Sequence, residues 1–165
     1  MKKKILLIST GGTFNKHYNP LNGKLEIDAH SLALEEISKR WLCDFEIINI
    51  IAKDSLDITN EDRLLLLATI NLAKEENILI IHGTDTMDTT ARYLADADLE
   101  KRIVLTGSMV PFSIDPIEAT ANLASAWGYM QHLSGYGIYI AMNGVFGSYD
   151  KVAKERTKGK FIVKP

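Results

Sequence analysis

The fold class is decided by one stretch, Ile78-Leu79-Ile80-Ile81-His82-Gly83-Thr84-Asp85-Thr86-Met87. Four consecutive aliphatic residues at 78–81 predict a central parallel strand that is covered on both faces. The strand runs directly into a loop rich in hydroxyl groups, and a helix is expected to follow to about Ala95. A buried strand, a short polar loop and a helix form the repeating unit of a parallel α/β sheet.

The same order of strand, loop and helix recurs along the chain. Apolar runs predict four further strands, at 4–9, 45–51, 102–105 and 137–142. Helical spacing predicts three further helices, at 29–42, 59–76 and 116–133. We therefore expect one domain over 1–165 with an α/β fold, a doubly wound (Rossmann-like or flavodoxin-like) parallel sheet with helices on both faces.

Three local patterns add detail to this outline. Two turn signals within 14–27 predict a hairpin or a mobile loop. Thr59 and Asp62 resemble a capping box, and the apolar face of the helix that they open is expected to hold Leu64, Leu65, Leu67, Ala68, Ile70 and Leu72. The segment 149–160 is polar and basic, and 161–163 is expected to form a final short strand.

Composition excludes several classes of protein. With 46% hydrophobic residues and a formal net charge of −2, the chain is neither disordered nor a general nucleic-acid binder. No apolar run approaches the ~20 residues of a membrane span. Lys2, Lys3 and Lys4 precede only four apolar residues, too few for a signal peptide, and Cys43 is the single cysteine. We expect a cytoplasmic protein without an internal disulfide and with no membrane association.

Four loops that follow the expected strands carry unusual polar groups. Each combines hydroxyl groups with glycine or a carboxylate: Thr10-Gly11-Gly12-Thr13, Asp54-Ser55, Gly83-Thr84-Asp85-Thr86 and Thr106-Gly107-Ser108. Glycine lets backbone N–H groups approach a ligand closely, and such groups can hold a carboxylate or a developing oxyanion. Since ligands bind doubly wound sheets at the carboxyl ends of the strands, these loops predict the site.

Other chemistries lack their motifs. The four His residues are scattered and no Cys pair exists, so no metal is expected. The chain has no G-x-S-x-G elbow, no P-loop and no G-x-G-x-x-G fingerprint. A threonine nucleophile needs a group that takes its proton, and a lysine can do this. The basic segment offers Lys151, Lys154, Lys158 and Lys160, and spacing alone does not choose among them.

Three motifs together resemble the bacterial-type L-asparaginase family. They are Thr10-Gly11-Gly12-Thr13, His82-Gly83-Thr84-Asp85-Thr86-Met87 and Val104-Leu105-Thr106-Gly107-Ser108-Met109. The resemblance runs from about residue 4 to 164. The family includes asparaginases, glutaminase-asparaginases and an amidotransferase subunit that acts on aminoacyl-tRNA, and it needs no cofactor.

The resemblance implies a role for five catalytic residues. Thr13 matches the first catalytic threonine, the proposed nucleophile, and Thr84 matches the second. Asp85 matches the carboxylate that binds the substrate α-amino group beside the lysine. Lys154 matches the catalytic lysine, and Tyr18 matches the tyrosine of a mobile loop that closes over the substrate.

The resemblance also implies a substrate site and a reaction. Ser55 matches the serine that holds the substrate α-carboxylate, and the other expected substrate-binding residues are Gly12, Asp54, Gly83 and Ser108. The implied reaction is a two-step hydrolysis, in which a threonine attacks the side-chain amide of L-asparagine or a related small amide and water hydrolyses the acyl-enzyme.

Two departures from the family leave alternatives open. Leu56 stands where the family usually has a polar residue that contacts substrate, and the family's smaller C-terminal domain is expected to be absent. Two alternatives to an amidohydrolase therefore stay open. One is a module that binds a small molecule or protein without turnover, and the other is an amidotransferase subunit that needs a partner chain. Apolar surface left by the missing domain predicts a homodimer.

Overall fold

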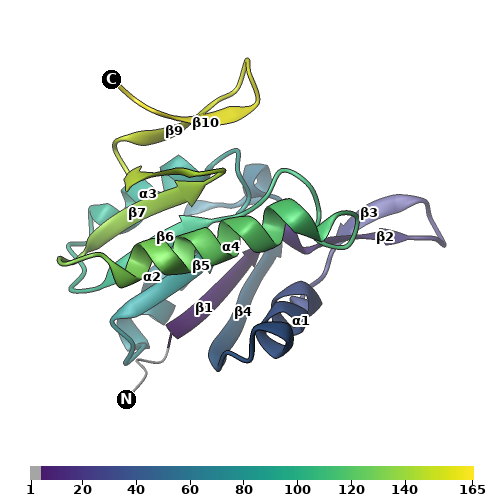
Figure 1. Cartoon of the computed structure of the whole chain (residues 1–165), viewed down its shortest axis with the longest axis horizontal. Coiled ribbons are helices and arrows are strands. Elements are labelled where there is room, and N and C mark those ends of the chain that lie inside the picture. The colour runs from purple at the N-terminus through teal and green to yellow at the C-terminus, as the bar shows by residue number, and fades with distance from the viewer. Residues whose placement is uncertain (1–4) are drawn as a thin grey trace.

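A computed structural model describes residues 5–165 (Figure 1). Lys4, the expected first residue of the first strand, and the two lysines before it lie outside the described residues. The central sheet has six strands in the order β4-β1-β5-β6-β7-β8. These strands are β1 (Ile5–Gly11), β4 (Phe45–Lys53), β5 (Asn77–Ile81), β6 (Arg102–Thr106), β7 (Gly137–Met142) and β8 (Val145–Ser148).

Five strands of the central sheet, β1, β4, β5, β6 and β7, are parallel and confirm the doubly wound fold. Ranked by their sequence order they lie as 2-1-3-4-5, which is the flavodoxin-like arrangement. The direction of winding reverses between β1 and β5. In such sheets a crevice opens at this reversal, outside the carboxyl ends of the strands.

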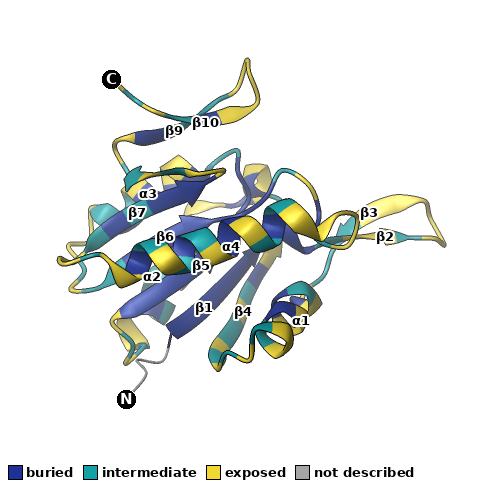
Figure 2. Cartoon of the chain, in the orientation of Figure 1, coloured by how far each residue is buried: buried dark blue, intermediate teal, exposed yellow. Residues whose placement is uncertain are grey.

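Helices cover both faces of the sheet, as expected (Figure 1). Helices α1 (Leu32–Trp41) and α4 (Pro116–Gln131) pack on one face, and α2 (Asn60–Leu72) and α3 (Met87–Ala95) pack on the other. β5 is buried along its whole length (Figure 2). Ile78 and Ile80 contact the core on the α2 and α3 side, while Leu79 and Ile81 contact the opposite core. Each buried aliphatic side chain contributes roughly 1.5–3 kcal/mol, which explains why this run forms the centre of the sheet.

The structure also has three hairpins, of which one adds β8 to the central sheet and two form separate two-stranded sheets. β2 (Lys16–Asn19) pairs with β3 (Lys24–Ile27), so the turn signals within 14–27 mark a hairpin. β9 (Val152–Glu155) pairs with β10 (Lys160–Val163), so the expected final strand is confirmed and begins one residue earlier. β7 pairs with β8 through the two-residue turn Asn143-Gly144, in which both residues have positive φ.

Two strands of the C-terminal part were not expected. β8 is antiparallel to β7, so the central sheet is mixed with mostly parallel strands, and β9 lies within the segment 149–160. Asn-Gly is the strongest short signal for a hairpin, and it would have identified β8. The sequence did not predict β9, because this strand depends on the tertiary contacts of Val152. Val152 is buried in the core that α2 and α3 cover.

The helix boundaries and one helix face also needed correction. α1 begins at Leu32 instead of Ala29, and α2 ends at Leu72 instead of residue 76. The capping box of Thr59 and Asp62 is confirmed. The buried stripe of α2, however, is Arg63, Leu66 and Ile70, whereas Leu64, Leu65 and Leu72 are exposed. Four consecutive leucines point in every direction around the helix, so their sequence does not show which face is buried. Packing on α3 and the sheet decided which of them face inward.

None of the helices in residues 5–165 is both long enough and apolar enough to cross a bilayer.

Candidate active site

The loops after β1, β4 and β5 touch one another through two glycines. A Cβ on Gly12 would lie 2.6 Å from the backbone nitrogen of Gly83, and a Cβ on Gly83 would lie 2.5 Å from the Cβ of Ser55. Any side chain at either position would push the loops apart. The absence of side chains there brings Thr13, Thr84 and Ser55 to one edge of the sheet, at the reversal between β1 and β5.

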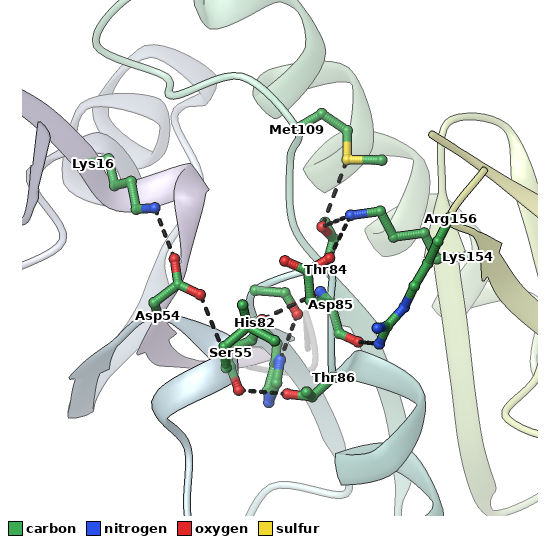
Figure 3. Close-up of polar contacts among 12 residues, drawn as sticks. Lys16, Asp54, Ser55, His82, Thr84, Asp85, Thr86, Met109, Lys154 and Arg156 are labelled. Atoms are coloured by element: carbon green, nitrogen blue, oxygen red, sulfur yellow. Dashed lines mark hydrogen bonds and ion pairs between the residues drawn. The ribbon is translucent and has the colours of Figure 1, made fainter. Parts of the chain in front are cut away.

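Lys154 joins this edge from the β9–β10 hairpin (Figure 3). Its Nζ donates to Thr84 Oγ1 at 2.9 Å and to Asp85 Oδ1 at 2.8 Å, and its side chain is 17% exposed. The lysine thus lies between a hydroxyl group and a carboxylate. The carboxylate orients the amine, and the same amine is placed to exchange a proton with the threonine.

The backbone around Asp85 is held by neighbouring loops. Ser55, which is buried, accepts the Asp85 N–H on its Oγ at 3.2 Å, and its carbonyl accepts the Thr86 hydroxyl at 2.7 Å. Arg156 donates to the Asp85 carbonyl at 2.7 Å. Sequence reasoning missed Arg156, because its contact depends on the pairing of β9 with β10.

Asp54 has two structural contacts. Its Oδ1 accepts the Leu56 N–H and begins the short helix η2 (Ser55–Asp57), and its Oδ2 lies 2.8 Å from Lys16 Nζ. The hydrogen bond from Lys16 lowers the pKa of Asp54 below its ordinary 3.8, and the Leu56 N–H acts in the same direction against partial burial. The substrate-binding role of Asp54 stays a prediction. Leu56 itself is 67% exposed.

The loop after β6 is tied to the start of α4. Ser108 is buried and its hydroxyl donates to the Val110 carbonyl at 2.6 Å. The Glu118 carboxylate accepts the N–H groups of Met109 and Val110, each at 2.9 Å. Thr84 Oγ1 in turn donates to Met109 Sδ at 3.6 Å. Met109 and Glu118 were not expected at the site, although a glutamate in the first turn of the helix that follows the loop was a usable signal.

Thr13 and Tyr18 belong to the segment that follows β1. Thr13 is half-buried and opens the short helix η1 (Thr13–Asn15), and Asn15 Nδ2 donates to the Gly11 carbonyl at 3.1 Å, which clamps the turn. Tyr18 lies on β2 and is 58% exposed. Its hairpin projects from the body of the molecule (Figure 1), so the structure does not join Tyr18 to the Lys154 cluster.

Within residues 5–165, no group of three or more His, Cys, Asp or Glu side chains is placed to hold a metal ion. The polar groups that do converge are a lysine, a carboxylate and hydroxyls. This set suits proton transfer and the recognition of a charged small molecule.

Comparison with known proteins places the chain in a family. The model described as "Asparaginase, N-terminal" matches residues 4–160. This chain belongs to the asparaginase family. It is 31% identical over 160 residues to the probable periplasmic L-asparaginase of Haemophilus influenzae, an alignment that covers 88% of this chain and 45% of the relative. It is 30% identical over 162 residues to the L-asparaginase of Thermococcus kodakarensis, covering 94% and 49%.

Solved asparaginase structures share the fold. The thermostable L-asparaginase from Thermococcus kodakarensis superposes with a TM-score of 0.81 at 27% identity, over 98% of this chain and 52% of that one. The probable cytoplasmic L-asparaginase from Campylobacter jejuni gives a TM-score of 0.74 at 28% identity, over 93% and 50%. The chain thus spans about half the length of these asparaginases.

Proposed function

We propose that this protein hydrolyses the side-chain amide of L-asparagine, or of a closely related small amide, to the acid and ammonia. One observation carries the proposal: Lys154 Nζ lies between Thr84 Oγ1 and the Asp85 carboxylate, at the carboxyl edge of the sheet. Membership of the asparaginase family supports it.

The proposed reaction has two steps. The Thr13 Oγ attacks the amide carbon, and its proton passes to a base, for which the Thr84 and Lys154 pair is placed when the lysine is neutral. The C–N bond then breaks, and the nitrogen takes up a proton and leaves as ammonia. Water hydrolyses the resulting ester, which releases the acid and restores the Thr13 hydroxyl. Backbone N–H groups of the glycine-rich loops stabilise the oxyanion.

Charge complementarity supports an amino acid as the substrate. In the proposal, Asp85 binds the α-ammonium group and the Ser55 hydroxyl binds the α-carboxylate. Gly12, Gly83, Asp54 and Ser108 complete the substrate site, and Tyr18 closes over it when the hairpin folds inward. We further propose that the protein is a cytoplasmic homodimer that needs no cofactor and binds no nucleic acid.

A second candidate is a domain that binds an amino acid or another protein without turnover, or that needs a partner chain for activity. The exposed apolar side chain of Leu56 beside Ser55 favours it, because a polar group there would add a substrate contact.

Ammonia release distinguishes the two candidates. Purified protein is assayed with L-Asn, L-Gln, D-Asn and a panel of small amides, beside Thr84→Ala and the control Thr89→Ala, which removes an exposed hydroxyl on α3. The proposal expects release that Thr84→Ala abolishes and Thr89→Ala leaves unchanged. No release from well-folded wild-type protein supports the second candidate.

A further inference from the structure

A chain of buried polar groups lies directly beneath the Thr84 loop. Arg63 on α2 donates from Nε to Thr90 Oγ1 on α3 at 3.0 Å. Thr90 Oγ1 lies 2.8 Å from His82 Nε2, and His82 Nδ1 lies 2.7 Å from the Gly83 carbonyl oxygen (Figure 3 shows His82 below Thr84). All three side chains are buried. The proposed reaction uses none of them.

The positions of the protons in this chain follow from chemistry. The Gly83 carbonyl can only accept, so His82 Nδ1 carries a proton and donates it. Burial lowers the pKa of His82 to about 4, and the positive charge of Arg63 acts in the same direction, while the Gly83 carbonyl and Asp88 oppose it. The imidazole is therefore neutral at pH 7 and its Nε2 is bare. Thr90 must donate to Nε2, and its oxygen accepts from Arg63, which can only donate.

Arg63, the first group in this series of hydrogen bonds, is a buried cation. Its side-chain partners are the neutral oxygens of Thr90 and Asn60, and it forms no ion pair within residues 5–165. Burying a charge without a countercharge is costly. A buried polar network whose groups are all hydrogen-bonded holds the structure around it in one arrangement.

The chain of hydrogen bonds acts on a single peptide group. The peptide between Gly83 and Thr84 is trans, as are all peptides in residues 5–165, so its C=O and N–H point in opposite directions. Because His82 holds the Gly83 carbonyl, the Thr84 N–H is turned away from the imidazole. The same residue carries the hydroxyl that contacts Lys154.

We infer that Arg63, Thr90 and His82 are positioning residues, which fix the Gly83–Thr84 peptide so that the Thr84 N–H and hydroxyl face the reacting amide. This inference rests on the proposed function for its catalytic part. His82 is not a proton donor or acceptor in the reaction. Its ring joins the hydrogen bond between Arg63 and Thr90 to the Gly83 carbonyl, and so holds the backbone of the site in place.

Substitutions at Thr90 test the inference by kinetics. Thr90→Val keeps the shape of the side chain and removes the hydroxyl, while Thr90→Ser keeps the hydroxyl. We expect Thr90→Val to lower kcat about 10- to 100-fold with KM changed less than about twofold. A Thr84 N–H that no longer points at the oxyanion stabilises the transition state less. Thr90→Ser should recover most of the loss. The control Thr69→Val removes a half-buried hydroxyl on α2 that donates to the Leu65 carbonyl, and it should change neither constant.

Nuclear magnetic resonance of the full chain tests the same inference without turnover. The nitrogen chemical shifts of His82 should report a protonated Nδ1 and a bare Nε2 from about pH 5 to pH 8, as its low pKa requires. The Thr84 amide signal should move in Thr90→Val and stay in place in Thr90→Ser and Thr69→Val.

Several outcomes would overturn the inference. They are a bare Nδ1, a charged imidazole at pH 7, an unmoved Thr84 amide in Thr90→Val, or equal kcat in Thr90→Val and wild type. If Thr90→Val does not fold, the tautomer and the charge of His82 at pH 7, both measured in wild-type protein, still decide. If wild-type protein releases no ammonia, the proposed function fails, and the Thr84 amide signal alone decides whether the peptide is held.

Discussion

Lys154 is a residue that links the two sequence-distant parts of the candidate site. Its Nζ makes short contacts with a hydroxyl group and with a carboxylate that lie about seventy positions earlier in the chain. Four lysines of the basic segment were candidates from sequence. The β9 strand selects one of them, because Val152 and Lys154 lie two residues apart and point to the same face. Val152 is buried in the core, so Lys154 faces the body of the molecule as well.

Removal of this amine should abolish turnover and leave the fold intact. We expect Lys154→Met to lower kcat for the best amide substrate by about 10²- to 10⁴-fold, the usual contribution of a general base. The matched control is Lys158→Met, since Lys158 lies in the turn of the same hairpin and pairs with Glu155. Ammonia release measures the effect and circular dichroism checks the fold. Similar activity in both variants would remove Lys154 from the mechanism.

The ion pair of Lys16 with Asp54 should contribute stability only above acid pH. The folded-state pKa of Asp54 is lowered, so the contribution is present above its unfolded pKa, 3.8, and is lost as the pH falls through the folded value. We expect Lys16→Met to reduce the free energy of unfolding by about 0.2–1 kcal/mol at pH 7 and the difference to shrink below pH 3.8. Urea unfolding of Lys16→Met, wild type and the exposed control Lys74→Met tests this. A difference that stays constant into acid would contradict it.

At the scale of the element, the strand-to-loop transitions place the site. β1 ends at Gly11 and is followed by Gly12, both with positive φ, and this turn lies against the loop after β5. The loops approach so closely because both contact positions are glycine. The apolar runs predicted the strands. The loops that follow them lie together at the carboxyl edge of the sheet, as the topology of a doubly wound sheet requires.

A substitution at Gly12 should separate steric contact from backbone strain. Gly12→Ala and Gly159→Ala both place alanine at positive φ, but only the first brings a Cβ to 2.6 Å from a backbone atom. We expect Gly159→Ala to cost about 1 kcal/mol of stability and Gly12→Ala at least about 3 kcal/mol, with loss of ammonia release. Thermal unfolding of the two variants provides the measurement. Equal costs would show that the two loops do not touch.

The buried face of α2 makes a separate prediction. Leu66→Ala should cost about 2–5 kcal/mol because it leaves a cavity in the core, whereas Leu64→Ala on the exposed side should cost within about 0.5 kcal/mol. Urea unfolding of the two variants decides between this face and the one expected from the leucine run. A larger cost for Leu64→Ala would restore the original expectation.

At the scale of the whole molecule, two distant parts of the chain form one site. The parallel sheet supplies Thr13, Ser55, Thr84 and Asp85 from loops at its carboxyl edge, and the C-terminal hairpin adds Lys154. Apolar side chains remain exposed beside this edge, including Ile114 and Ile117 at the start of α4. Such surface favours association with another protein surface.

We expect the protein to be a homodimer at micromolar concentration. A stable interface buries at least about 1,200 Å², and the exposed apolar groups near the site offer part of that surface. Light scattering coupled to size-exclusion chromatography measures the mass directly. A strictly monomeric species at all micromolar concentrations would contradict the expectation.

The sequence by itself determined the features that depend on near neighbours. The aliphatic run of β5, the capping box of α2 and the glycine-rich strand ends are local patterns, and each was found where it was predicted. The order of polar loops at strand ends was also sufficient to locate Thr84, Asp85 and Ser55 together, because parallel strands all end at one edge.

Only the tertiary structure decided the features that depend on distant partners. The choice of Lys154, the inward face of α2 and the buried chain from Arg63 to His82 each depend on residues that meet after folding. A charged residue such as Arg63 carries no sequence signal of burial, because the hydroxyl that accepts its hydrogen bond lies on another helix. Burial of Val152 and Phe161 likewise orients the hairpin that carries the lysine, and no pattern within the basic segment encodes that contact.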